Sequence, residues 1–236
     1  MDDWKSSVRG AWLGSVFRLG AGLLVAPQLG ARPERPLELY EFEGCPFCRK
    51  VRETLTYLDL EAVIYPCPKN GTRFRPKATE LGGKAQFPLL VDPNTHTTLS
   101  ESDAINKYLA VTYGQGSRPL MASLGPVTMI SSALSSAVGN RGGARPSKAP
   151  ARPLELWSFE GSPYCRVARE KLCELELPYL LHNVGKKSPR RAAFIARSGK
   201  MQVPWLSDPN TGTELFESKA IVDYLDQTYG LSAQGK

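Results

Sequence analysis

The sequence has few cysteines, only two histidines and no long hydrophobic run. The longest nearly apolar stretches, residues 19–26 and 120–134, are shorter than the roughly 18–20 residues that a transmembrane helix needs. Five unevenly spaced cysteines do not fit the disulfide framework of a small secreted protein. We therefore expect no membrane span, and we interpret the cysteines as thiols of a reducing compartment.

The positive charge is concentrated in one segment. The 236 residues carry a net charge of +7, and residues 115–151 contribute four Lys and Arg with no acidic residue. This segment is rich in Gly, Ala, Ser and Pro, a composition typical of a connector, where scattered charge serves solvation. The distribution argues against a nucleic-acid footprint, which needs a basic patch on a folded surface.

An internal repeat divides the chain. Residues 35–60 match residues 152–177 at 16 of 26 positions without a gap, and residues 88–114 match residues 204–230 at 17 of 27. A repeat of this length indicates two copies of one domain. We place the copies at 35–114 and 152–236. An N-terminal extension, 1–34, precedes them, and a linker, 115–151, joins them.

Each copy has the pattern of a small α/β domain. In the first copy an apolar strand over 37–42 precedes Pro46, which suits the first turn of a helix. Further strands are expected near 62–65, over 87–91 and up to Leu99. Helices are expected within 69–84 and over 101–113. The order is strand, helix, strand, helix, strand, strand, helix.

The helix after Pro46 is expected to be amphipathic. Apolar residues recur at spacings of four and three along one face, namely Val51, Leu55 and Leu58. The charged residues of the same segment fall off that face: Arg49, Lys50, Arg52 and Glu53.

Both flanking segments also show helical periodicity. In the first, apolar residues recur at Trp4, Val8, Trp12, Val16, Leu19 and Leu23, and in the linker at Val127, Ile130, Leu134 and Val138. We expect helices that pack on or between the two copies. For residues 1–34, a membrane-surface helix and a degenerate plastid transit peptide are alternatives, although Asp2 and Asp3 are atypical of transit peptides.

Cys45 has the position of a reactive thiol. A cysteine at the first turn of a helix faces unpaired backbone N–H groups and the positive end of the helix dipole, which favour thiolate. Arg49 and Arg52 add positive potential, whereas Glu43 opposes it. Cys48 lies one turn further on and deeper, where a resolving thiol can attack a mixed disulfide on Cys45.

The order of elements and the Cys-x-x-Cys motif resemble the thioredoxin fold in its glutaredoxin form. The pairs Glu101-Ser102 and Glu217-Ser218 make the chain more similar to the N-terminal, glutathione-binding domain of soluble glutathione transferases. The whole chain resembles tandem proteins of plants and other photosynthetic organisms. We therefore expect two tandem thioredoxin-fold (βαβαββα) domains. The helical domain that lines the transferases' electrophile pocket has no counterpart here.

The resemblance implies a glutathione site in the first copy. Phe87 and Pro88 would present backbone groups to the tripeptide, with Pro88 in the cis form facing Cys45. Ser102 and the helix N-terminus would hold the γ-glutamyl carboxylate, and Glu101 its ammonium. Lys84 and Gln86 are candidate partners for the glycyl carboxylate. Simple capping by Glu101-Ser102, and an edge strand that merely begins at Pro88, are the alternatives.

The second copy departs from this pattern, because Ser162 replaces the first cysteine. Ser162 either donates to bound glutathione, as in serine-type transferases, or caps a helix in a degenerate copy. The other counterparts are Cys165, Val203, Pro204, Glu217 and Ser218. Cys165 and Cys173 are expected in the core.

The other cysteine and the histidines give no clear site. A zinc site needs about four ligands, and only Cys67 and His96 accompany the Cys-x-x-Cys motif. Iron–sulfur ligation, known among similar glutaredoxins, goes with a monothiol motif that the first copy lacks. We therefore expect no metal, and we interpret His96 and His182 as surface or packing residues.

The leading hypothesis is a glutathione-linked thiol–disulfide oxidoreductase that acts on disulfides or glutathionylated proteins, with glutathione as co-substrate. A non-catalytic module that binds glutathione or a protein is the alternative, and a conjugating glutathione transferase is a third hypothesis. The resemblance points to the chloroplast, with the cytoplasm as the alternative.

Overall fold

Both copies fold with the predicted order of elements. The structure, a computed structural model, describes residues 22–117 and 143–231. The first copy contains β1 (Leu37–Glu41), α2 (Pro46–Tyr57), β2 (Ala62–Pro66), α3 (Arg75–Gly82), β3 (Leu89–Asp92), β4 (Thr97–Ser100) and α4 (Ser102–Tyr113). The second contains β5 (Leu154–Ser158), α6 (Pro163–Glu174), β6 (Tyr179–Asn183), α7 (Arg191–Ser198), β7 (Trp205–Asp208), β8 (Thr213–Phe216) and α8 (Ser218–Tyr229). The predicted tandem, thioredoxin-like α/β fold is confirmed.

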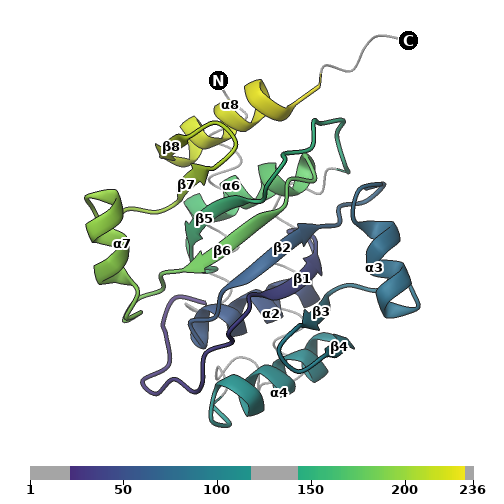
Figure 1. Ribbon diagram of the computed structural model, residues 1–236, viewed down its shortest axis with the longest axis vertical. Helices are drawn as coiled ribbons and strands as arrows, with labels where there is room; N and C mark the ends of the chain where they lie inside the picture. Colours follow the sequence, from purple (N-terminus) through teal and green to yellow (C-terminus); the bar gives the residue numbers. More distant parts are fainter. Residues whose placement is uncertain (1–21, 118–142, 232–236) are drawn as a thin grey trace.

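The two copies share one eight-stranded sheet, in the order β4-β3-β1-β2-β6-β5-β7-β8. Strands β2 and β6 run antiparallel at its centre, where Figure 1 shows them side by side. Ala62 pairs with Leu181, and Ile64 pairs with Tyr179. A shift of 117 residues relates the copies here, so each of these pairs is the image of the other. The copies are thus related by an approximate two-fold axis at the Val63–Leu180 pair, as in an isologous dimer.

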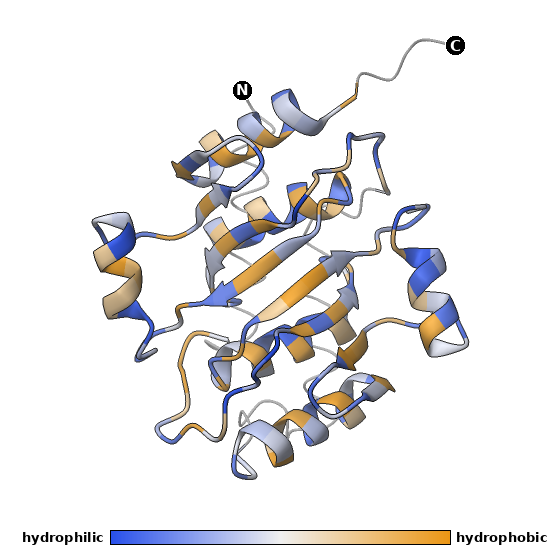
Figure 2. Cartoon of the chain, in the orientation of Figure 1, coloured by the Kyte–Doolittle hydropathy of each residue, from blue (hydrophilic) through white to orange (hydrophobic). Residues whose placement is uncertain are grey.

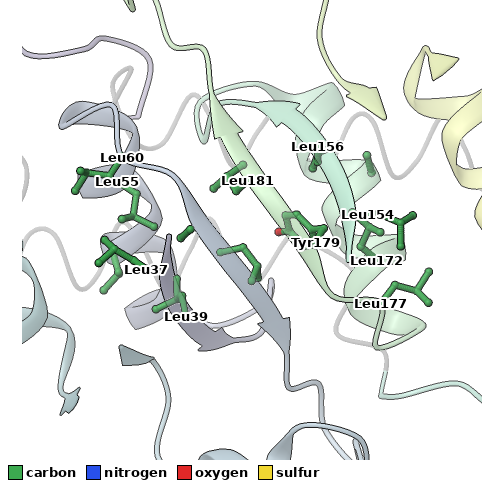
Figure 3. Packing of buried hydrophobic residues seen from close by; sticks show 14 of the residues in the cluster. Leu37, Leu39, Leu55, Leu60, Leu154, Leu156, Leu172, Leu177, Tyr179 and Leu181 are labelled. Carbon is green, nitrogen blue, oxygen red and sulfur yellow. The ribbon is translucent and has the colours of Figure 1, made fainter. Parts of the chain in front are cut away.

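One buried apolar cluster contains residues of both copies. It contains Leu37, Leu39 and Leu55 from the first copy and their counterparts Leu154, Leu156 and Leu172 from the second, all fully buried. Figure 3 shows these leucines on either side of β2 and β6. The hydropathy colouring shows apolar segments on both central strands (Figure 2). Burying each such side chain stabilises the fold by about 1.5–3 kcal/mol, so the two copies stabilise one another.

The charged residues that lie off the apolar face of α2 are not exposed to solvent. Arg49, Lys50, Arg52 and Glu53 are all buried. The periodicity identified the face that packs on the sheet, but the opposite face is also covered. Arg49 and Arg52 reach Glu160 of the second copy, so the second copy supplies the partners that make this burial possible.

A buried network of arginines and glutamates lies near the two-fold axis. Arg52 contacts Glu160 across the axis (2.9 Å), and its counterpart Arg169 contacts Glu43 (3.0 Å). Arg52 also pairs with Glu41, while Arg169 donates to the hydroxyl of Ser158, the counterpart of Glu41. Each arginine side chain is 1% exposed. Arg52, Arg169, Glu43 and Glu160 therefore each have partners from both copies.

Further polar contacts join the copies on both sides of this network. Arg190 donates to the carboxylate of Asp59 (3.1 Å). At the positions related by the two-fold axis, Arg73 donates through its guanidinium to the Glu176 carbonyl (2.7 Å), and its backbone N–H donates to the Glu176 carboxylate (3.0 Å). Asp59 and Glu176 both have positive φ angles, 52° and 48°. In each copy, the turn at this position therefore accepts hydrogen bonds from an arginine of the other copy.

The flanking segments are described only in part. Residues 22–34 form turns and one bridge, between Leu24 and Lys186, so the helix expected over 1–34 does not include this part. The rest of that prediction falls on residues 1–21, and the predicted linker helix on residues 118–142, outside the described residues. Among the helices of residues 22–117 and 143–231, none combines the length and apolar composition that crossing a bilayer requires.

Removal of Arg52 should destabilise the whole protein. The substitution Arg52→Met leaves the buried Glu41 without its arginine partner and removes one of the arginines around Glu160, and breaking a buried pair in this way costs about 3–5 kcal/mol. Lys77→Met is the control, because the pair between Lys77 and Glu80 is exposed and should contribute less than about 1 kcal/mol. Urea denaturation followed by circular dichroism measures both. An Arg52→Met protein as stable as the control would contradict the role given to the network.

Candidate functional site

Cys45 caps helix α2. Its backbone is extended (φ −84°, ψ 121°), and its sulfur accepts a hydrogen bond from the backbone N–H of Cys48 at 3.2 Å. Pro46 occupies the first turn, where a missing N–H costs nothing. The sequence therefore builds a helix start whose cap is a sulfur atom, and the free N–H groups there favour its anionic form.

The two thiols of the motif differ in acidity. Hydrogen bonds from Cys48 lower the pKa of the Cys45 thiol below its ordinary value, although burial acts in the opposite direction. Burial raises the pKa of Cys48 well above its ordinary value, and its hydrogen bond to Cys45 adds to this effect. Cys45 is 3% exposed and Cys48 is fully buried. Substrates can reach Cys45 only through that small remaining surface, and Cys48 is the deeper thiol.

Arg49 and Arg52 do not act on Cys45 in the way predicted from sequence. Both guanidinium groups bind carboxylates of the buried network rather than the sulfur. The hydrogen bonds at the helix cap, not these cations, account for most of the lowering of the Cys45 pKa.

Phe87 and Pro88 lie against Cys45. The peptide bond between them is cis, as the resemblance implies, and the Phe87 carbonyl oxygen lies 4.0 Å from the Cys45 sulfur. The Phe87 ring packs edge-on against Phe42 (6.1 Å) and beneath the guanidinium of Arg75 (4.8 Å). The strand before α2 and the loop before β3 therefore meet at the sulfur.

Glu101 and Ser102 begin helix α4. Glu101 has a positive φ of 76°, which is strained for a residue with a side chain, and Ser102 is buried. The Gln86 amide donates to the Glu101 carboxylate at 2.5 Å. Gln86 therefore contacts Glu101, another residue of the predicted site, whereas the sequence predicted the glycyl carboxylate as its partner. Lys84 is exposed two residues earlier.

The second copy keeps this geometry with a serine in place of Cys45. Ser162 has the same backbone (φ −83°, ψ 120°) and accepts the Cys165 N–H at 3.3 Å. The Val203-Pro204 bond is cis, Glu217 has a φ of 68°, and the Gln202 amide donates to it. Ser218 is buried at the start of α8. Cys165 and Cys173 lie in the core.

The remaining predicted residues lie apart from Cys45 or pack in the interior. His182 stacks on Trp157 (4.1 Å), and its Nδ1 atom lies 2.6 Å from Glu61, so it has a packing role. His96 lies in a turn with φ 55°. Cys67 is fully buried, and burial raises the pKa of its thiol. Across residues 22–117 and 143–231 no group of three or more His, Cys, Asp or Glu side chains could hold a metal ion.

Comparison with known proteins agrees with this arrangement. The family described as "Glutathione S-transferase, N-terminal domain" matches the chain twice, over residues 39–117 and 156–233. The chain belongs to this family. Both Cys45 and its counterpart Ser162 fall within the matched segments.

Individual relatives match only part of the chain. The glutathione S-transferase-like protein gedE of Aspergillus terreus is 35% identical over 77 residues, which are 33% of this chain and 34% of that protein. A solved structure, the glutathione transferase BmGSTD1 of Bombyx mori, is 29% identical, covers 36% of this chain and 39% of its own, and has a TM-score of 0.32. The chain thus spans about a third of each relative's length. The plant group and the chloroplast stay predictions.

In this member of the glutathione S-transferase N-terminal domain family, the sequence did not reveal a set of polar residues that lies near the start of α4. Buried Lys50 pairs with Asp103 at 2.5 Å, and the amide of buried Asn106 has no hydrogen-bond partner among the described residues. The second copy has Val167 and Val222 at the positions of Lys50 and Asn106. Comparing the two copies position by position would have found this group, because polar residues replaced by valine mark an environment that differs between them.

Glu41 was also missed. It lies at the end of β1, and burial, with help from Glu43 and Glu160, raises its pKa to about 7 despite its contact with Arg52. Its charge in turn acts against ionisation of Cys45. The alternation of side chains along β1 does not indicate that the ionisable side chain of Glu41 is buried near the Cys-x-x-Cys motif.

Alkylation should distinguish the two thiols of the motif. Because the pKa of Cys45 is lowered and that of Cys48 is raised, iodoacetamide at pH 7 should modify Cys45 first, and its rate should rise with pH through the lowered pKa. Mass spectrometry of the modified peptides measures each site. The Cys48→Ser protein should still react at Cys45. Preferential labelling of Cys48 would contradict the assignment.

Glu41 should make stability depend on pH. Its folded pKa, about 7, lies above its ordinary value, so the folded state holds the proton more tightly than the unfolded chain. Its contribution to the free energy of unfolding is full below about pH 4.5 and is lost as pH rises to 7. The wild type minus Glu41→Gln difference should therefore fall by on the order of 2 kcal/mol over this range. For Ser158→Ala, at the related position, the difference should stay constant, and a constant difference for Glu41→Gln would refute the prediction.

Proposed function

We propose that the first copy is a glutathione-linked thiol–disulfide oxidoreductase centred on Cys45. The observation that carries this proposal is the position of the Cys45 sulfur, which caps a helix, accepts the Cys48 N–H at 3.2 Å and lies 4.0 Å from the Phe87 carbonyl. A thiolate favoured by its cap and placed beside the backbone of Phe87 suits attack on the disulfide of a small peptide.

The first step exchanges one disulfide for another. The Cys45 thiolate attacks the glutathione sulfur of a glutathionylated substrate, a new S–S bond forms, and the substrate thiol leaves and takes up a proton. A second glutathione thiolate then attacks the Cys45 adduct, which releases oxidised glutathione and restores the Cys45 thiolate. Alternatively, Cys48 displaces glutathione and forms a disulfide with Cys45, which two further glutathiones reduce.

The first copy also supplies groups for the two ends of glutathione. The free backbone of Phe87 pairs with the cysteinyl part, and Ser102 with the start of α4 receives the γ-glutamyl carboxylate. One oxygen of Glu101 is engaged by Gln86, so the other meets the γ-glutamyl ammonium. Lys84, exposed near the Phe87 loop, accepts the glycyl carboxylate.

A second candidate function is non-catalytic binding. It is favoured by the second copy, which keeps cis Pro204, the strained Glu217 and the buried Ser218 although it lacks a nucleophile. In this case glutathione would bind without exchange. A Cys45 pKa near the ordinary thiol value of about 8.5 would favour binding over catalysis.

Cys45→Ser should abolish reduction of a mixed disulfide between glutathione and a peptide thiol, since serine cannot form the adduct. The full-length protein is assayed with excess glutathione, and release of the peptide thiol is measured. Ser162→Ala is the matched control in the second copy and should keep the activity, because its loss removes only a helix cap worth about 1 kcal/mol. Mass spectrometry after exposure to oxidised glutathione should show the adduct on Cys45. Undiminished turnover by Cys45→Ser would refute the proposal.

A further inference from the structure

The turn that carries Cys45 is held in place by the second copy. The turn spans residues 42–45 and is closed by a hydrogen bond from the Cys45 N–H to the Phe42 carbonyl at 3.0 Å. Glu43 lies inside it, two residues before the nucleophile, and is buried. Its position therefore affects where the sulfur lies.

Glu43 is held by contacts from both copies. Arg169 of the second copy binds its carboxylate in a bidentate manner, through Nε at 3.0 Å and Nη2 at 3.1 Å. Arg52 of the first copy lies 3.3 Å from the same carboxylate and donates to the Glu43 carbonyl at 3.3 Å. The shorter, bidentate contact therefore comes from the second copy.

We propose that Arg169, from the serine-bearing copy, is a positioning residue for Cys45, because it anchors and neutralises Glu43 in the turn before the nucleophile. The part that Arg169 plays in catalysis rests on the function proposed above. It also gives the second copy a role that needs no thiol chemistry of its own. The second copy acts as a built-in partner that completes the first copy's site.

The charged groups of the network near the turn come from both copies. Glu41, Glu43 and Glu53 belong to the first copy and Glu160 to the second, and they pair with Arg49, Arg52 and Arg169. Without Arg169 all four carboxylates stay but one of these three arginines is lost, and Glu43 keeps Arg52 alone of the two arginines that contact it. An unbalanced carboxylate close to Cys45 disfavours the thiolate. The loss of a bidentate contact also frees the turn.

The test measures the pH profile of Cys45 alkylation by iodoacetamide in the full-length protein. In Arg169→Met we expect the profile to move to higher pH by about one unit, which makes the rate about tenfold lower at pH 6–7. Arg169→Lys keeps the charge but not the two-pronged contact, so it should restore part of the rate. A merely structural role would leave the profile of the folded protein unmoved.

The matched control is Glu160→Gln, at the position related to Glu43. It removes an equally buried charge but leaves the fork between Arg169 and Glu43 intact, so Cys45 alkylation should not slow. If Arg169→Met does not fold, the double variant Glu43→Gln/Arg169→Met removes both charges, so no buried Glu43 carboxylate is left with Arg52 as its remaining arginine. Its Cys45 should still react at least about threefold more slowly than wild type, because the turn has lost its anchor.

Wild-type profiles in folded Arg169→Met, or in the double variant, would overturn the inference. The readout needs no glutathione, so it separates this inference from the proposed function. A wild-type protein that fails to reduce the glutathione mixed disulfide would refute the oxidoreductase, whereas the effect of Arg169 on the Cys45 sulfur would still be decided by alkylation.

Discussion

Arg52 and Arg169 each cross an approximate two-fold axis to bind a glutamate of the other copy, in a region from which water is excluded. Desolvating these ions is expensive, and their mutual attraction offsets that cost only when the geometry is satisfied on every side. The geometry is satisfied because the β2–β6 pairing fixes the two copies in one register. A slip of that pairing would move each arginine away from its glutamate. The network therefore specifies how the copies fit together more than it adds to net stability.

The two copies are equivalent in backbone and unequal in chemistry. Both keep a capped helix start, a cis proline and a strained glutamate before the last helix. The side chains around these features differ, with Cys45 against Ser162, Lys50 against Val167 and Asn106 against Val222. In the last two pairs the polar member lies in the first copy. One copy thus carries a candidate reaction centre, and the other supports it through a shared interface.

Much of this fold could be predicted from the sequence. The repeat, the order of elements and the helix start at Cys45 and Pro46 all follow from local patterns, since turn chemistry and periodicity act over a few residues. The burial of Arg49, Lys50, Arg52 and Glu53 could not be predicted in this way. For Arg49 and Arg52 it depends on Glu160, more than 100 residues away in the second copy, and for Lys50 it involves Asp103 of α4. Helical periodicity reports one apolar face without saying what covers the other. The same limit hid the contact between Arg169 and Glu43.

The continuous sheet has a consequence for how the chain comes apart. If one copy unfolded alone, the central strand of the other copy, β2 or β6, would become an unpaired sheet edge. The buried arginines and glutamates of the folded copy would also lose their partners from the unfolded one. Unfolding of one copy alone therefore costs free energy in two ways, through the lost β2–β6 pairing and through buried charges without partners. We therefore expect the two copies to unfold as one cooperative unit, although the sequence divides them into two domains.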